Sequence, residues 1–217
     1  LGDVGADAQP VGLLAVGGRC FEYWSEDPYL AGHEAIGIVA GVQSKGVGTS
    51  LKHFAANSQE TDRLRISANI SQRALREIYF PAFEHIVKEA QPWTIMCAYN
   101  CINGVHAAQD RWLLTDVLRD EWGFQGIVMS DWGADHDRVA SLNAGLNLEM
   151  PPSYTDDQIV YAARDGRIQP AQLDRMAQGM IDLVNKTRAA MSVENYRFDI
   201  EAHDEVAHQA AVESMVL

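Results

Sequence analysis

Short apolar runs between glycines and polar clusters divide the chain into alternating segments. A run of about four to eight apolar residues bounded by turn residues is typical of a strand buried on both faces. Short apolar runs lie within 93–99 and 126–131, the segment 48–57 resembles a strand whose end is polar, and a shorter segment at 145–150, in which apolar and polar residues alternate, stops at two prolines. The pattern therefore predicts a strand in each of these segments.

Apolar positions with helical spacing occupy most of the remaining chain. From Ser71 to Ala90 apolar pairs recur every four residues, as on the buried face of a helix, and Ser71 can cap the first turn. Pro81 lies inside this helix and should kink or divide it. Further helices are expected at 32–42, 110–123, 135–143, 156–164 and 171–188, and loops at 1–32, 58–68 and 100–109.

Strands that alternate with helices over residues 48–190 predict an α/β fold with a parallel sheet. The right-handed crossover rule leaves either a barrel or an open sheet, and the pattern alone does not choose between them. The periodicity lapses over 191–202, which we interpret as a linker, and a helical pattern resumes at 203–217.

The composition is that of a globular protein with an acidic surface. Of the 217 residues, 47% are hydrophobic and 22% charged, and the net charge is -13. This charge argues against nucleic acid and anionic membranes as partners, while neutral small molecules and self-association stay open. No apolar run is long enough to cross a membrane and no signal-peptide pattern is present. Because the first residue is Leu1, we expect the natural N-terminus to lie upstream, and no compartment is favoured.

The cysteines are too few and too scattered for a metal site or a disulfide framework. Cys20, Cys97 and Cys101 form an odd set without a second pair. We expect them to be reduced thiols packed inside the protein. The chain also lacks the His-x-His, His-Glu-x-x-His, Gly-x-Ser-x-Gly and P-loop motifs, so no metal and no cofactor are predicted.

Polar residues gather where the predicted strands end. In a barrel these ends converge on one pocket, where a carboxylate, cations and aromatic rings suit a sugar: rings pack on its apolar face, cations donate to hydroxyls, and a carboxylate stabilises the anomeric carbon. Position alone leaves another role open for Asp131, because an aspartate after a strand is more often a helix N-cap. The residues at the ends are Lys52, His53, Tyr99, Asn100, Asp131 and Trp132.

A series of motifs covers the chain from about Gly18 onward. They are Lys52-His53-Phe54-Ala55-Ala56-Asn57 with Glu60 and Arg63, Ala74-Leu75-Arg76-Glu77-Ile78-Tyr79, Tyr99-Asn100 with Asn103-Gly104, Leu113-Leu114-Thr115-Asp116-Val117-Leu118-Arg119, Trp122-Gly123-Phe124 and Ser130-Asp131-Trp132-Gly133. In this order they resemble glycoside hydrolase family three, specifically its β-glucosidase branch.

The resemblance implies a fold and a division into domains. Residues 1–190 would form a (β/α)8 TIM-type barrel that is incomplete at its N-terminus, 191–202 a linker, and 203–217 the first helix of an α/β sandwich domain. That second domain usually carries the acid/base of the reaction. The acid/base would therefore be missing from this chain, which alone should be inactive and should need the remainder of the enzyme as its partner.

The resemblance also assigns roles to single residues. Asp131 would be the nucleophile of a retaining β-glucosidase that releases terminal, non-reducing glucose through a glycosyl-enzyme intermediate. Arg19, Lys52, His53, Arg63 and Tyr99 would line the sugar subsite, with Trp132 as its wall.

Two alternatives remain open, and one departure from the family is visible. A β-xylosidase or other β-glycosidase of the family would carry the same motifs, and the chain could instead be a non-catalytic sugar-binding or assembly fragment. Asn147 stands where many relatives have aspartate, which would change a local hydrogen-bond network without touching Asp131.

Overall fold

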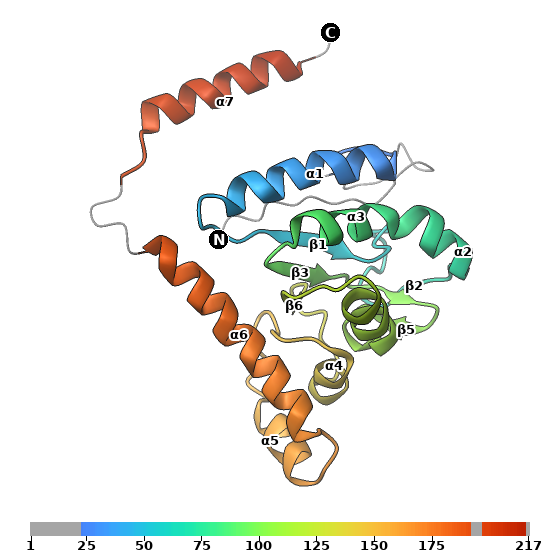
Figure 1. Ribbon diagram of the computed structural model, residues 1–217. Coiled ribbons are helices and arrows are strands. Elements are labelled where there is room, and N and C mark those ends of the chain that lie inside the picture. The colour runs from blue at the N-terminus through green and yellow to red at the C-terminus, as the bar shows by residue number, and fades with distance from the viewer. Residues whose placement is uncertain (1–22, 192–196, 216–217) are drawn as a thin grey trace.

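The computed structural model describes residues 23–191 and 197–215, and a parallel sheet lies at its centre (Figure 1). The sheet has three strands in the order β1-β3-β6: β1 (Ser50–Phe54), β3 (Thr94–Cys97) and β6 (Ile127–Ser130). All pairings are parallel, and most strand residues are buried. The three main predicted strands and the α/β class are therefore confirmed.

Two helices, α1 (Pro28–Gln43) and α3 (Pro81–Ala90), pack against each other over one face of this sheet (Figure 1). We expected the first helix to begin near residue 32, but it begins at Pro28. Asp27 accepts hydrogen bonds from the N–H groups of Tyr29 and Leu30, and proline suits the first helical turn because it lacks an N–H to satisfy. The end of the segment predicted as a loop therefore contains a helix cap at Asp27 and the first turn of α1.

The helix predicted from Ser71 to Ala90 is divided at Pro81, as expected. Ser71 accepts a hydrogen bond from Ala74 N–H at 3.2 Å and caps α2 (Gln72–Ala74). The next turn, η2 (Leu75–Tyr79), is a π-helix in which Phe80 N–H donates to Leu75 O, and α3 starts afresh at Pro81. The helix predicted at 110–123 is likewise a π-helix over most of its length, η4 (Trp112–Glu121).

Two of the predicted loops contain short strands. β2 (Ser67–Ala68), β4 (Cys101–Ile102) and β5 (Val105–His106) form a second sheet, in which β4 and β5 make a hairpin. Asn103 and Gly104 both have positive φ, as a two-residue turn between hairpin strands requires. A 3-10 turn, η3 (Ala107–Gln109), follows. The loop prediction was wrong here because strands of two residues carry no measurable periodicity.

The predicted strand at 145–150 is also wrong: it is reduced to one parallel bridge between Met129 and Leu148. The helices of this half are α4 (Arg138–Ala144), α5 (Asp157–Arg164), α6 (Pro170–Met191) and α7 (Ile200–Ser214). We expected the last helix to begin at 203, but it begins at Ile200. Asp199 caps it by accepting a hydrogen bond from Ala202 N–H. Figure 1 shows α7 apart from the other helices, and its described side chains are exposed.

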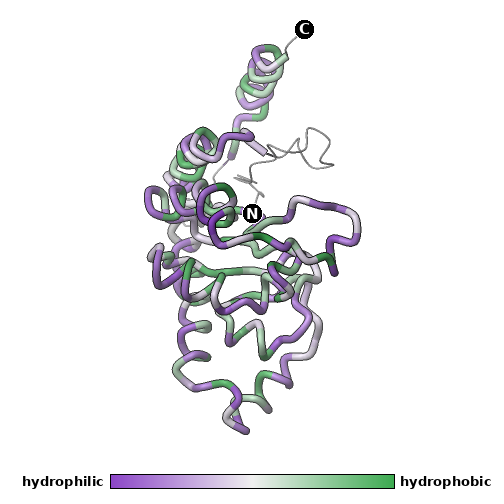
Figure 2. Tube along the Cα trace, turned by 90° about the vertical axis from the view of Figure 1, so that its right-hand side faces the viewer, coloured by the Kyte–Doolittle hydropathy of each residue, from purple (hydrophilic) through white to green (hydrophobic). Residues whose placement is uncertain are grey.

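Aromatic side chains fill the space between the sheet and the covering helices. Phe54 lies 5.1 Å from Phe83 and 5.6 Å from Trp122 between ring centroids, and Phe80 lies 5.5 Å from Trp122. Figure 2 shows the hydrophobic segments concentrated along the middle of the molecule, where the strands run. Within 23–191 and 197–215, no helix is long and apolar enough to cross a membrane.

Candidate active site

Asp131 follows β6 directly and is 7% exposed. Its backbone N–H donates to Cys97 O at 3.2 Å, which continues the pairing of β6 with β3. One carboxylate oxygen, Oδ1, accepts the Trp132 N–H at 2.6 Å, and the other, Oδ2, lies 3.3 Å from His53 Nε2. Oδ2 has no partner with hydrogen-bond geometry in the part of the chain that the structure describes. The carboxylate is thus oriented through Oδ1, while Oδ2 lies near His53.

The alternative role of Asp131 as a helix cap does not hold. The next helix, α4, begins at Arg138, and its cap is Asp137, whose Oδ1 accepts the N–H groups of Val139 and Ala140 at 3.0 Å. Asp131 is therefore buried without a capping duty.

The end of β1 brings His53 to this carboxylate. His53 is 2% exposed, whereas its neighbour Lys52 is half-buried. The register of β1 against β3 shifts between Leu51 and Phe54, and the Lys52–His53 peptide bond lies within this irregular stretch and is cis. Lys52 and His53, which we predicted at this strand end, therefore lie on β1. In the sheet, β3 lies between β1 and the strand that precedes Asp131.

A second pair forms at the end of β3. Arg63 Cζ lies 4.6 Å from the centroid of the Tyr99 ring, a cation–π distance, and Arg63 Nη1 donates to Glu60 Oε2 at 2.9 Å. Tyr99 is 6% exposed, whereas Trp132 is 63% exposed and offers an uncovered ring beside Asp131. The remaining predicted site residue, Arg19, lies outside the described residues.

Two asparagines at the same strand ends had no assigned role in our prediction. Asn100 donates from Nδ2 to Ala55 O at 3.2 Å and to Cys101 O at 3.1 Å, and so ties the loop after β3 to the end of β1. Asn57 is 3% exposed, and its side-chain amide atoms have no hydrogen-bond partner within the described ranges. Their place at the ends of predicted strands was the available signal.

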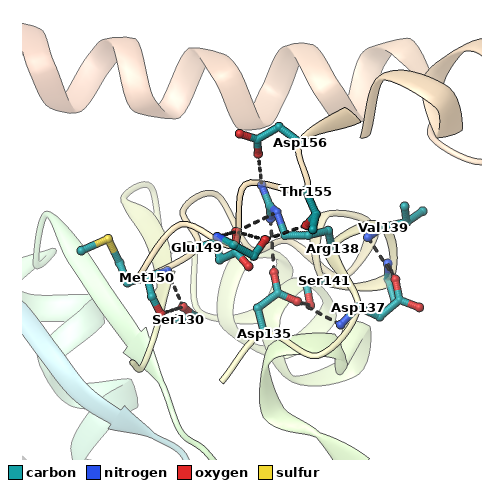
Figure 3. A network of polar contacts seen from close by, with 12 residues as sticks. Ser130, Asp135, Asp137, Arg138, Val139, Ser141, Glu149, Met150, Thr155 and Asp156 are labelled. Carbon is teal, nitrogen blue, oxygen red and sulfur yellow. Dashed lines mark hydrogen bonds and ion pairs between the residues drawn. The ribbon is translucent and has the colours of Figure 1, made fainter. Parts of the chain in front are cut away.

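The loop after Asp131 is held by an arginine that our sequence analysis missed (Figure 3). Arg138 is 13% exposed; its Nη1 donates to Asp135 Oδ2 at 3.2 Å, its Nε lies 3.4 Å from Glu149 Oε2, and its Nη2 lies 3.6 Å from Asp156 Oδ1. Asp135 also accepts the Ser141 hydroxyl at 2.7 Å. An arginine seven residues after the motif aspartate carries no periodic signal, so only the fold identifies the network.

Asn147 takes part in a further network, which includes the backbone of β6. Its Oδ1 accepts Arg119 Nη2 at 2.8 Å and Val128 N–H at 2.9 Å, and its Nδ2 donates to Met176 O at 3.1 Å. The amide therefore links β6 to α6 without contacting Asp131.

The described thiols are packed, as predicted. Cys97 and Cys101 are both buried and free, and burial raises the pKa of Cys97 to about 12 and raises that of Cys101 as well. Cys20 lies outside the described residues. Burial and the neighbouring His136 lower the pKa of His106. In 23–191 and 197–215, no group of three or more His, Cys, Asp or Glu side chains could hold a metal ion.

Asp131, His53 and the ring of Tyr99 with Arg63 on it gather at the carboxyl ends of the parallel strands. TIM-type barrels carry catalysis at this end of their strands. The fold and the site thus define an α/β class of protein whose polar residues gather at the carboxyl ends of a parallel sheet.

Comparison with known proteins identifies the family. Residues 13–183 match the model for the Glycosyl hydrolase family 3 N terminal domain. The chain belongs to glycoside hydrolase family 3, as the motifs predicted, and this domain is a TIM-type barrel, of which the described residues contain three parallel strands.

The relatives include enzymes with two different names. Over 202 residues the chain is 88% identical to an exo-alpha-(1->6)-L-arabinopyranosidase of Bifidobacterium breve, and 49% identical to thermostable beta-glucosidase B of Acetivibrio thermocellus. The first match covers 93% of this chain and 27% of the B. breve enzyme. The second covers 92% of this chain and 27% of the A. thermocellus enzyme. The chain therefore spans about a quarter of the length of these curated relatives.

Solved structures agree on the fold. A beta-glucosidase of Bifidobacterium adolescentis is 85% identical, with a TM-score of 0.91, and the match covers 99% of this chain and 31% of that one. Beta-glucosidase 3B of Thermotoga neapolitana, solved with alpha-D-glucose, is 40% identical, with a TM-score of 0.86 and coverages of 96% and 30%. These relatives and neighbours differ in the sugar that they are named for.

Proposed function

We propose that this chain supplies the nucleophile and the sugar subsite of a retaining exo-glycosidase that releases terminal, non-reducing β-D-glucose. The observation that carries the proposal is the Asp131 carboxylate, which is buried, held through Oδ1 by Trp132 N–H at 2.6 Å, and open at Oδ2 apart from His53 at 3.3 Å. Among the described residues, Asp131 neither caps a helix nor pairs with an arginine, so neither role explains why this carboxylate is buried.

The reaction follows from one carboxylate on each side of the glycosidic bond. Asp131 Oδ2 attacks the anomeric carbon while the bond to the leaving oxygen breaks and an acid group protonates that oxygen. Water then attacks the same carbon, loses its proton to the same group, and displaces Asp131. Two inversions give retention of configuration. The second carboxyl group should lie about 5 Å from Asp131, and we place it in a second domain outside these 217 residues.

The residues around Asp131 suit the glycone. Lys52, His53 and Arg63 carry N–H donors for ring hydroxyls, and Arg19 is proposed as a further donor. Trp132, at 63% exposure, offers a flat face on which the apolar side of a pyranose can pack. Tyr99 lies under Arg63 and would fix the direction of that guanidinium.

A second candidate substrate is a terminal α-L-arabinopyranoside. The observation that favours it is the 88% identity to enzymes named exo-alpha-(1->6)-L-arabinopyranosidase from two Bifidobacterium species. An α-L-arabinopyranoside and a β-D-glucoside both present an equatorial leaving group, but arabinose lacks the hydroxymethyl group and has an axial O4. The same nucleophile geometry therefore serves both sugars, and contacts to C4 and C5 would choose between them.

Aryl glycosides test the choice of sugar. A protein of the relatives' length that contains this chain should be assayed with the 4-nitrophenyl β-D-glucoside, β-D-xyloside and α-L-arabinopyranoside. We expect the highest kcat/KM for the glucoside. A higher value for the xyloside or the arabinopyranoside would overturn the first choice in favour of that sugar, without affecting the assignment of Asp131.

A 2-fluoro-glycoside tests the nucleophile, because fluorine at C2 slows the second step and traps the glycosyl-enzyme. Peptide mapping should place the label on Asp131, and a label elsewhere would refute the assignment. Asp131→Asn should lower kcat/KM roughly 10⁴-fold or more. The matched control is Asp137→Asn, in the same loop, which keeps an oxygen that can cap the helix and should stay within about tenfold of the parent.

The remaining alternative is a non-catalytic fragment. We expect the 217 residues alone to turn over no glycoside, because we place the acid/base in a second domain outside them, and addition of that domain should restore hydrolysis. Hydrolysis by the isolated chain would contradict our placement of the acid/base, and a protein of full length that cleaves none of the three glycosides would favour the non-catalytic alternative.

A further inference from the structure

Two histidines face each other on the helices that cover the sheet. His33 belongs to α1 and His85 to α3, and His33 Nδ1 lies 3.1 Å from His85 Nε2. The ring centroids are 4.6 Å apart, and the planes cross at 77°. The glycosidase chemistry uses neither residue, and they are separated by 52 positions in the chain.

Packing holds both rings in this arrangement. Tyr29 lies edge-on to His33 with 4.2 Å between ring centroids, and its ring is nearly parallel to that of His85 at 6.2 Å. Gly32 leaves the space that the His85 ring occupies, because a Cβ at Gly32 would come within 3.3 Å of His85 Cδ2. The pair is therefore oriented by its neighbours as well as by its own contact.

The distance between the nitrogens is compatible with neighbouring positions on a metal ion. Imidazole nitrogens bind first-row metal ions at about 2.1 Å. For a nitrogen separation of 3.1 Å, two bonds of about 2.1 Å enclose an angle of about 95° at the ion. Tetrahedral ligands would need nitrogens about 3.4 Å apart, whereas neighbouring positions of a square or octahedral ion need about 3.0 Å.

We propose that His33 and His85 form a two-histidine binding site for a tetragonal first-row metal ion, Cu²⁺ or Ni²⁺, with water in the remaining positions. Imidazole is a preferred ligand of both ions, and Cu²⁺ stands highest in the affinity series of the divalent ions. His33 is exposed and His85 half-buried, so the ion reaches the pair from solvent. In the absence of the ion, one ring donates its N–H to the other across the same 3.1 Å.

The neighbouring side chains leave the two nitrogens as the protein ligands. Glu84, next to His85 in sequence, already accepts Lys88 Nζ at 2.5 Å. No third His, Cys, Asp or Glu completes a cluster within the described part of the chain. The site therefore differs from a closed structural site and should release its ion to a chelator.

Calorimetry and electron paramagnetic resonance test the proposal on a protein of the relatives' length that contains this chain, purified without a histidine tag. CuCl₂ should bind with one site that is lost, by at least about tenfold in affinity, in both His33→Gln and His85→Gln. The Cu²⁺ spectrum should be axial and show two nitrogen donors. His208→Gln, on the exposed helix α7, is the matched control and should bind as the parent does.

Affinity that is unchanged in both His33→Gln and His85→Gln would overturn the site. So would a spectrum with fewer than two nitrogen donors, or equal loss of binding in His208→Gln. Because His33 is exposed and His85 only half-buried, both variants are expected to fold. Circular dichroism checks this in the same samples.

Discussion

Replacement of Arg138 by alanine should destabilise the domain by about 3–5 kcal/mol, because it leaves two buried carboxylates without their cation. Arg138 is 13% exposed, and the side chains of Asp135 and Glu149 are 1% and 9% exposed. The third partner, Asp156, is 79% exposed and should contribute only about 0–1 kcal/mol. Asp135 keeps the Ser141 hydroxyl as a donor, so the lower end of the range is expected.

Urea denaturation of a protein that contains this chain measures the effect as a fall in the free energy of unfolding of the barrel domain. The matched control is Arg65→Ala. Arg65 also contacts an aspartate, Asp62, at 2.9 Å, but their side chains are 82% and 63% exposed, so less than about 1 kcal/mol should be lost. Arg138→Lys keeps the charge without the guanidinium fork and should fall between parent and alanine variant.

The reasoning would be refuted if Arg138→Ala cost no more than Arg65→Ala. That result would mean that solvent reaches Asp135 and Glu149 once the arginine is gone, so that burial in the folded protein imposes no penalty on them.

Two other predictions concern groups that the structure shows as buried. Asn147→Ala should cost about 1–3 kcal/mol for each buried group that it leaves unpaired, Arg119 and the Val128 N–H among them, whereas Asn147→Asp keeps the acceptor and should cost less. Urea denaturation measures both, and equal losses would contradict the role of the shared oxygen. In a Cys20→Ser background, the thiol of Cys97 should resist iodoacetamide at pH 8, since burial raises its pKa to about 12 and the thiolate is the reactive form. Mass spectrometry should find it alkylated only after unfolding, and rapid labelling of the folded protein would refute its burial.

The strands of the sheet could be predicted because their signal is local. Residues 127–129 are all apolar, and a strand that is covered on both faces needs such a run. A local signal failed at 145–150, where apolar and polar residues alternate but only one bridge forms, at Leu148. Whether an apolar run becomes a strand depends on the partner that it meets, which the run itself does not specify.

The candidate site divides in the same way. Strand ends and motifs predicted Lys52, His53, Tyr99 and Asp131 as residues near one pocket. They did not predict that His53 Nε2 approaches Asp131 Oδ2. Contacts of this kind depend on backbone direction and side-chain rotamers at the ends of different strands, and neither can be derived from residue types.

The amino-acid sequence by itself determined the alternation of strands and helices, the family, and the aspartate on which the chemistry is proposed to depend. These follow from short-range patterns, since apolar spacing and capping residues act over a few positions. Only the tertiary structure decided that Asp137 rather than Asp131 caps a helix, that Arg138 joins buried carboxylates, and that His33 faces His85. These are relations between segments that packing brings together, and their energies arise from the burial that packing creates.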